Sequence, residues 1–145
     1  MMISGSTVLL TGATGGLGQA IARALYARGA ELRLVGRRAD VLARLAAELD
    51  GATTAAADLG DPAAVARLLA EAAGTDILVA NAGVPAAGRL ESFSSAEVDG
   101  TLQVNLQTPV TLAHGLLPGT VILPEIEETN SRCPRSRSSM PGSNP

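Results

Sequence analysis

Four glycines within seven residues constrain the fold of this chain more than any other feature. Residues 11–18 read TGATGGLG, and they follow a short apolar run and precede apolar residues at helical spacing. Gly12 permits a tight turn, and Gly18 allows close packing of a helix on a strand. Gly16, or Gly15, lets the backbone approach a pyrophosphate. In this strand–loop–helix context the pattern predicts a dinucleotide-binding loop at a helix N-terminus; a purely structural tight turn is the alternative.

The rest of the composition indicates one globular domain without a nucleic-acid or membrane surface. The 145 residues suit a single domain, and 46% of them are apolar. The net charge is −3 and the basic residues, all arginine, are scattered, which argues against nucleic-acid binding. The single cysteine excludes an internal disulfide and a multi-cysteine metal site, so we expect a reducing compartment and no metal. No stretch resembles a signal peptide or a membrane span, and we expect a cytoplasmic protein.

Strand and helix patterns alternate at short intervals, which predicts an α/β fold: a Rossmann-type, doubly wound parallel sheet with right-handed crossovers. We expect Leu17 and Ala24 on the buried face of the first helix, and Asp40 and Asp61 as N-caps of the next two. The last of the four predicted strands is continuously apolar and should be covered on both faces. The strands are predicted at residues 7–10, 31–35, 53–57 and 76–80. The helices are predicted at residues 17–28, 40–49, 61–74 and from 94 or 95 to about 117, with a kink before Pro109.

Two arginines follow the second predicted strand and favour one dinucleotide over another. Arg37 and Arg38 stand there, and no carboxylate occurs between the end of the strand and Asp40. A carboxylate at this point binds a ribose 2′-hydroxyl, whereas arginine accommodates a 2′-phosphate through paired, charge-assisted hydrogen bonds. We therefore expect NADP(H) as the cofactor, with NAD(H) less favoured. A solvated pair of surface arginines is the alternative.

Four motifs in order resemble the N-terminal portion of the short-chain dehydrogenase/reductase family. Residues 11–18 fit its TGxxxGxG loop, and also the TGxxGxxG spacing of its extended branch. Residues 81–83 match its NAG motif, and residues 104–106 match its VNL segment. Asp58 and Leu59 stand where the family contacts adenine. The resemblance covers residues 5–118.

The resemblance implies a role for each matching residue. Asp58 would accept a hydrogen bond from the adenine amino group, and Arg37 with Arg38 would meet the 2′-phosphate. Asn105 is the one catalytic assignment, as the residue that fixes a water in a proton relay; a side chain that caps the helix kink is the alternative. Together, the residues assigned to the cofactor are Gly12, Thr14, Gly15, Gly16, Leu17, Gly18, Arg37, Arg38, Asp58, Leu59, Asn81, Ala82 and Gly83.

The catalytic tyrosine, lysine and serine of the family have no counterpart in this sequence. Family members use a YxxxK motif, and general acid–base help of this kind is worth about 10²–10⁴-fold in rate. The only tyrosine is Tyr26, in the first predicted helix, and there is no lysine. His114 and Cys133 have no identifiable partner. We expect an NADP-dependent oxidoreductase of alcohol or carbonyl substrates by ancestry, inactive as this chain; the alternative is a non-catalytic dinucleotide-binding or sensing module.

The composition changes near the C-terminus. Residues 1–123 are expected to form an incomplete NADP(H)-binding domain, whose sheet stops after about the fourth or fifth strand. Residues 119–123 could begin that fifth strand. Residues 124–145 are rich in serine, proline and arginine, which predicts a disordered tail. The sequence from about Gly119 onward is interpreted as translation out of frame or past a truncation. The exposed sheet edge would then favour a homo-oligomer or aggregation.

Overall fold

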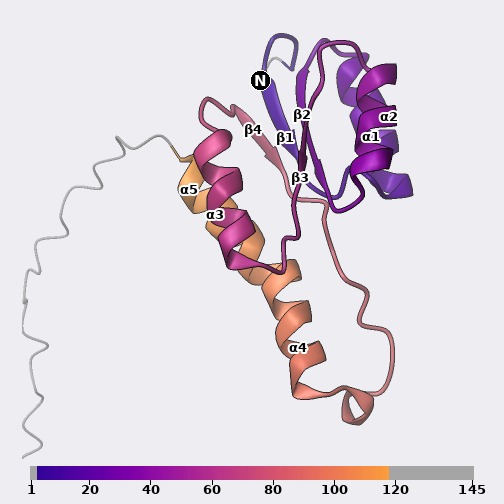
Figure 1. Cartoon of the computed structure of the whole chain (residues 1–145), viewed down its shortest axis with the longest axis vertical. Helices are drawn as coiled ribbons and strands as arrows, with labels where there is room; N and C mark the ends of the chain where they lie inside the picture. The colour runs from indigo at the N-terminus through magenta and orange to yellow at the C-terminus, as the bar shows by residue number, and fades with distance from the viewer. Residues whose placement is uncertain (1–2, 118–145) are drawn as a thin grey trace, which may run out of the picture.

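In the computed structural model, which describes residues 3–117, four parallel strands form one sheet in the order β3-β2-β1-β4. The chain winds outward from β1 through β2 to β3, and then returns to add β4 on the other side of β1 (Figure 1). This reversal makes a topological switch point between β1 and β4, the place where open α/β sheets bind ligands. The strands are β1 (Thr7–Leu10), β2 (Glu31–Gly36), β3 (Thr53–Ala56) and β4 (Ile77–Val79).

Helices cover both faces of the sheet, as the doubly wound fold predicts. On one face lie α1 (Gly16–Tyr26) and α2 (Ala39–Glu48), and on the other lie α3 (Pro62–Glu71) and α5 (Thr108–Leu116) (Figure 1). A short 3₁₀ turn, η1 (Leu90–Ser92), precedes α4 (Ser95–Leu102), which extends away from the sheet. A π-helical turn, η2 (Gln103–Gln107), joins α4 to α5.

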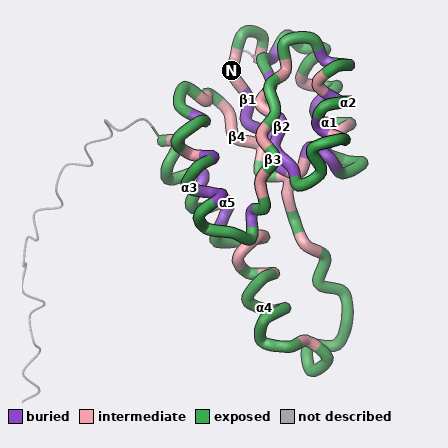
Figure 2. Tube along the Cα trace, in the orientation of Figure 1, coloured by how far each residue is buried: buried purple, intermediate pink, exposed green. Residues whose placement is uncertain are grey.

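The sheet divides the hydrophobic core into two parts, and side chains of β1 contribute to both. Successive side chains of a strand point to opposite faces. Val8 and Leu10 therefore pack with α1 and α2, whereas Leu9 packs with Val65 and Leu112 of the other layer. Val8, Leu9 and Leu10 are each at most 1% exposed. Figure 2 shows the buried positions gathered along the central strands and on the helix faces turned toward them.

Several predicted details of the helices need correction. Asp61 does cap α3, since its Oδ1 accepts from the Ala63 N–H at 2.9 Å. Asp40 is not a cap: α2 begins one residue earlier, and Asp40 lies in its first turn and pairs with Arg44. Leu17 is 70% exposed and Ala24 is exposed as well, because the face of α1 that meets the sheet is centred on Gly18 and Ala22.

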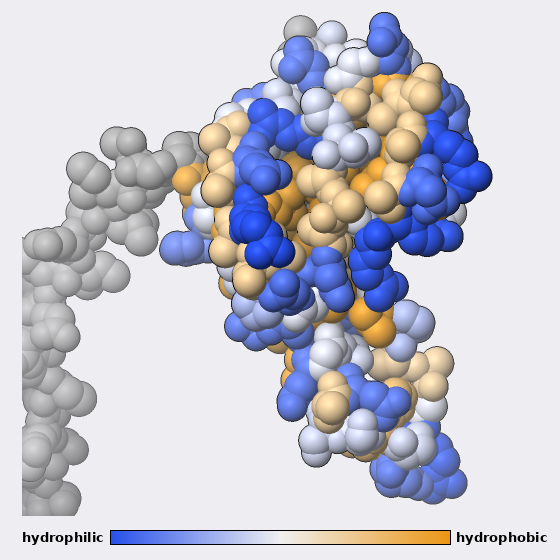
Figure 3. Space-filling model, viewed as in Figure 1, coloured by the Kyte–Doolittle hydropathy of each residue, from blue (hydrophilic) through white to orange (hydrophobic). Residues whose placement is uncertain are grey.

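Strand β4 is also less buried than its apolar sequence predicts. Ile77, Leu78 and Val79 are all only half-buried, because within residues 3–117 the strand pairs with β1 alone. On the outer part of the sheet, a second cavity of about 310 Å³ opens between α3 and strands β2 and β3. Apolar side chains are visible between α3 and the sheet in Figure 3.

The remaining expectations about the C-terminal region lie outside the described residues. These are the strand at residues 119–123, the tail at 124–145, the domain boundary between them, and the surroundings of Cys133. None of the helices within residues 3–117 has the length and apolar character needed to cross a membrane.

Candidate functional site

A cleft of about 570 Å³ opens where the carboxyl ends of the strands meet. This volume lies within the ~300–1,000 Å³ of ordinary ligand pockets. Every residue assigned to the cofactor from sequence lines it, so the structure brings together segments that follow each of the four strands. Four further lining residues were not assigned to the cofactor from sequence. They are Gly36, Ala57, Val84 and Val104.

The glycine loop is shaped by close backbone approach. Gly12 has φ +67°, and a Cβ there would lie 2.8 Å from the Ala82 Cα. A Cβ on Gly18 would lie 2.1 Å from the Gly12 carbonyl oxygen, so Gly18 lets α1 begin against the glycine loop rather than against the strand itself. Gly16 differs, because a Cβ on it would meet nothing within 4 Å. Its backbone therefore borders open space where a ligand can approach.

The N-terminus of α1 is equipped to receive an anion. Its N-cap, Gly15, makes no side-chain cap hydrogen bond, and no acidic residue occupies the first turn. The first N–H groups of an α-helix have no acceptor within the helix, and they carry the positive end of its dipole. Gly15 and Gly16 line the cleft, so these groups are at its wall.

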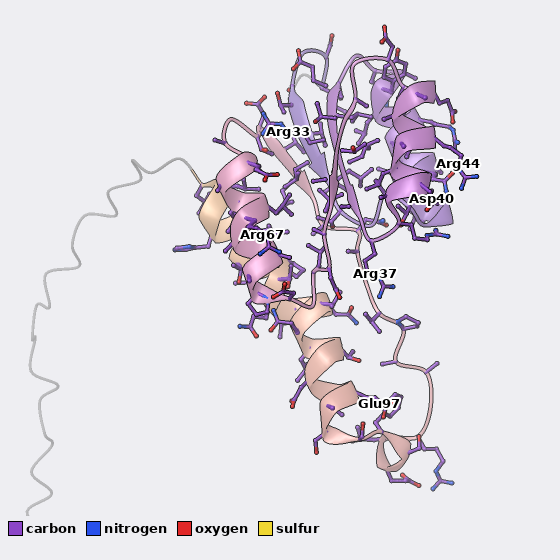
Figure 4. The ribbon with its side chains drawn as sticks, viewed as in Figure 1. Arg33, Arg37, Asp40, Arg44, Arg67 and Glu97 are labelled. Atoms are coloured by element: carbon purple, nitrogen blue, oxygen red, sulfur yellow. The ribbon has the colours of Figure 1, made fainter. Side chains whose placement is uncertain are left out.

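The two arginines after β2 are held differently. The Arg38 guanidinium donates through Nη2 to the carbonyl oxygen of Thr14, which ties the end of β2 to the glycine loop. Arg37 is exposed and lines the cleft, and its side chain has no hydrogen bond or ion pair to the described part of the chain. Figure 4 shows Arg37 near the end of the sheet where the strands finish, whereas Arg44 lies on the outer side of α2. Arg37 is therefore free to meet a ligand phosphate.

A buried threonine that the sequence analysis did not single out connects the glycine loop to the segment after β4. The Thr11 hydroxyl accepts from the backbone N–H groups of Asn81 and Ala82, both at 3.1 Å. In return, the Asn81 amide Nδ2 donates to the carbonyls of Thr11 at 3.2 Å and Gly12 at 3.3 Å. Thr11 is 2% exposed, so its own side chain is shielded from solvent. In the sequence, Thr11 was included only as the first residue of the TGxxxGxG match, which assigned no role to its side chain.

Asn105 lies in the π-helical turn and does not line the cleft. Its Oδ1 accepts from the Val84 N–H at 2.7 Å, and its Nδ2 donates to the Val84 carbonyl at 2.9 Å. The amide thus holds the segment after β4 from the helix side instead of capping the kink. Pro109 has no N–H to donate to the carbonyl four residues earlier, which is that of Asn105, and this accounts for the departure from α-helical geometry.

The segment after β3 presents Asp58 at the cleft and anchors itself with Leu59. Asp58 Oδ1 accepts from the Gly60 N–H at 3.0 Å, which fixes the carboxylate in a tight local turn. Leu59 is 6% exposed and packs in the second core, and its carbonyl accepts from the Thr108 hydroxyl at 2.8 Å.

Within residues 3–117, neither the single tyrosine nor the single histidine lines the cleft. Tyr26 ends α1, and an 11-residue helix places it ~15 Å from the helix N-terminus that borders the cleft. His114 is exposed in the last turn of α5. The described residues also contain no cluster of three or more side chains that could hold a metal ion.

Comparison with known proteins identifies the family. The family model described as "short chain dehydrogenase" matches residues 6–123. The chain belongs to this family. Among curated short-chain dehydrogenase relatives, "Dehydrogenase/reductase SDR family member 7B" of Bos taurus is 33% identical over 133 residues, covering 82% of this chain and 41% of that protein. Its Mus musculus counterpart is 34% identical over 129 residues, covering 80% and 40%.

Solved short-chain dehydrogenase structures agree with the fold. A "putative betaketoacyl-ACP reductase" is 35% identical with a TM-score of 0.74, covering 78% of this chain and 48% of its own. A "short-chain dehydrogenase from Sphingobium yanoikuyae in complex with NADPH" is 32% identical with a TM-score of 0.71, covering 77% and 46%. The chain therefore spans about half the length of these structures, and about two fifths of the cattle and mouse proteins.

Proposed function

We propose that this member of the short-chain dehydrogenase family binds NADP(H) in the cleft, with the 2′-phosphate at Arg37. The observation that carries the proposal is the position of Arg37: it is exposed and borders the cleft without a hydrogen-bonding partner in residues 3–117. A guanidinium binds phosphate through two parallel, charge-assisted hydrogen bonds. Arg38, already bonded to Thr14, would add charge and hold the loop in place.

The residues of the cleft suit a dinucleotide along its whole length. The open backbone at Gly16 and the uncapped N-terminus of α1 would receive the pyrophosphate. Asp58 would accept from the adenine amino group, and Asn81 with Gly83 would lie near the nicotinamide ribose. The NADPH complex of the Sphingobium enzyme is consistent with this choice of cofactor.

We infer further that the complete catalytic unit oxidises an alcohol or reduces a carbonyl compound. The bound nicotinamide would supply or accept the hydride. The contribution of this chain is to bind and orient: Thr11 and Asn81 join the glycine loop to the segment after β4, and Asn105 holds that segment through Val84. Asn105 remains the residue that we propose for the proton relay.

Calorimetric titration of NADPH and NADH tests the cofactor assignment. Arg37→Ala should weaken NADPH binding about 10- to 100-fold, because it removes charge-assisted bonds that only the 2′-phosphate makes, and it should leave NADH binding unchanged. Arg44→Ala is the matched control: it removes the same charge from α2, but Arg44 pairs with Asp40 and does not line the cleft. Equal weakening of NADPH and NADH by Arg37→Ala would exclude the assignment.

A second candidate is a non-catalytic module that binds or senses NADP(H). The absence of lysine from the sequence and the position of Tyr26 far from the cleft favour it. The two candidate functions differ in whether the chain catalyses oxidation of NADPH by a carbonyl compound. The purified chain is mixed with NADPH and a panel of ketones and aldehydes, and cofactor oxidation is followed at 340 nm. Binding without oxidation of the cofactor supports the module, whereas oxidation that depends on a carbonyl compound supports the enzyme.

A further inference from the structure

Thr108 makes a buried connection that joins α5 to the segment after β3. Its hydroxyl donates to the Leu59 carbonyl at 2.8 Å, and the residue is 1% exposed. The same oxygen accepts from the Gln103 side-chain Nε2 at 3.2 Å. A hydroxyl whose oxygen already accepts from Gln103 is oriented to give its single proton to Leu59.

The segment that Thr108 holds carries the carboxylate proposed for adenine. Asp58 precedes Leu59 and is exposed at the cleft, so its own environment restrains only the local turn. Its position relative to α1 and β2 depends on Leu59, whose side chain is buried and whose carbonyl is fixed by Thr108. The same turn passes beside η2, since a Cβ added to Gly60 would lie at ordinary van der Waals distance, 3.7 Å, from the Val104 side chain.

The same stretch of helix also supports the other end of the cleft. Asn105 holds Val84 in the segment after β4, and Thr108, three residues later, holds Leu59 in the segment after β3. One turn of helix thereby fixes the separation of two segments that we propose to contact opposite ends of the dinucleotide.

We propose that Thr108 is a positioning residue for adenine recognition, acting through the Leu59 carbonyl on Asp58. The inference rests on the proposed dinucleotide function and deepens it. It predicts a loss of affinity that is the same for NADPH and NADH, because both carry adenine. Arg37, in contrast, should distinguish the two cofactors.

Thr108→Val tests this role with almost no change of shape, since it replaces the hydroxyl by a methyl group. We expect the dissociation constants of NADPH, NADH and adenosine 2′,5′-bisphosphate each to rise about five-fold, the equivalent of one lost hydrogen bond. Thr108→Ser keeps the hydroxyl and should restore affinity to within about two-fold. Thr111→Val, an exposed threonine one turn further along α5, is the control and should change nothing. Circular dichroism melts confirm that titrations are made on folded protein.

The outcomes distinguish failure of the proposed NADP(H) binding from failure of the role proposed for Thr108. If the wild-type chain binds neither NADPH nor adenosine 2′,5′-bisphosphate, the proposed function fails and this inference with it. If the wild type binds and Thr108→Val binds equally well, or loses affinity for NADPH alone, only the inference is overturned. Should Thr108→Val not fold, Gln103→Leu removes the group that orients the hydroxyl, and it must weaken NADPH and NADH by a common factor for the inference to stand.

Discussion

Gly16 and Gly18 stand two residues apart in the first turn of α1, yet the structure gives them opposite constraints. A Cβ on Gly18 would overlap the Gly12 carbonyl oxygen at 2.1 Å, and that oxygen belongs to backbone that cannot rotate away. A Cβ on Gly16 would meet nothing within 4 Å and would project into space bordering the cleft. Folding therefore requires the second glycine, whereas the first would be required only by the approach of the proposed ligand.

Gly18→Ala and Gly16→Ala should consequently have separable effects. We expect Gly18→Ala to lower the free energy of unfolding by about 2 kcal/mol or more, because the glycine loop must shift to admit the methyl group. Gly16→Ala should leave stability unchanged or slightly higher, since alanine favours the helix, while weakening NADPH. Urea denaturation and calorimetric titration measure the two effects. Similar stability losses in both variants would contradict this account of the loop.

Many residues that line the cleft could be predicted from sequence because they follow a strand within a few residues. The carboxyl ends of parallel strands share one edge, so Gly12, Arg37, Asp58 and Asn81 had to meet there. Their supports could not be predicted in the same way. Thr11 bonds to a segment 70 residues away, and no sequence periodicity specifies which hydroxyl reaches which carbonyl across that separation.

At the scale of elements, α4 has its own N-terminal support, although it extends away from the sheet. The Ser94 hydroxyl accepts from the Glu97 N–H at 3.3 Å, and the Glu97 carboxylate accepts from the Ser94 N–H at 2.8 Å. These reciprocal bonds form a capping box, which satisfies two donors that the helix itself leaves free. The Ser94 hydroxyl also donates to the Glu97 carboxylate at 2.7 Å. This bond lowers the pKa of Glu97 most, and the bond from the Ser94 backbone N–H lowers it further.

The direction of this pKa change predicts how acid affects α4. A carboxyl whose pKa is lower in the folded than in the unfolded chain stabilises the fold fully above the unfolded value, and loses that contribution as pH falls through the folded value. The difference in free energy of unfolding between wild type and Glu97→Gln should therefore shrink as pH falls from about 7 to about 3. Denaturation series followed by circular dichroism provide the measurement.

Glu31→Gln serves as the control for this titration. Glu31 is an exposed glutamate in β2 whose side chain has no hydrogen bond or ion pair to residues 3–117. Its difference from wild type supplies the baseline for the loss of one exposed carboxylate. A Glu97→Gln difference that changes no more with pH than this baseline would show that the capping box does not contribute through the charged carboxylate.

Element types were predictable from sequence wherever a local signal was strong, and burial was not. Asp61 followed by proline specified the start of α3, and the structure confirms it. The apolar residues 76–80 predicted a strand covered on both faces, but β4 is only half-buried. An apolar sequence shows that a strand can be buried, and it does not show which elements cover the strand. The burial of β4 depends on neighbours that the periodicity of its own sequence does not describe.

At the scale of the whole molecule, we expect two surfaces to favour self-association. Within the described chain, β4 is an edge strand that pairs only with β1. Large apolar side chains are also exposed along α4, η2 and α5. They are Leu102, Leu106, Val110 and Leu117, each more than half exposed. Unpaired strand edges and exposed apolar patches both promote association.

We therefore expect the average mass from light scattering to rise with protein concentration. Replacing Leu106 and Val110 together by glutamate should reduce this rise, since both positions are exposed and the added charges repel each other. Replacing Ala20 and Ala24, exposed on α1, by glutamate adds the same charge at another surface and should have less effect. A monodisperse monomer at high concentration would contradict the prediction.

The hydrogen bonds that hold the cleft together have a consequence for how its specificity can change. The side chains of Arg38, Asn81, Asn105 and Thr108 all donate to main-chain carbonyl oxygens of neighbouring segments, so these bonds do not depend on the side chain of the residue that is held. Val84 is only half-buried, so its side chain can be exchanged while Asn105 still holds its backbone. Thr14 and Leu59 are buried, so packing constrains their side chains as well. A library randomised at Val84 should therefore retain more folded members than a library randomised at Asn105.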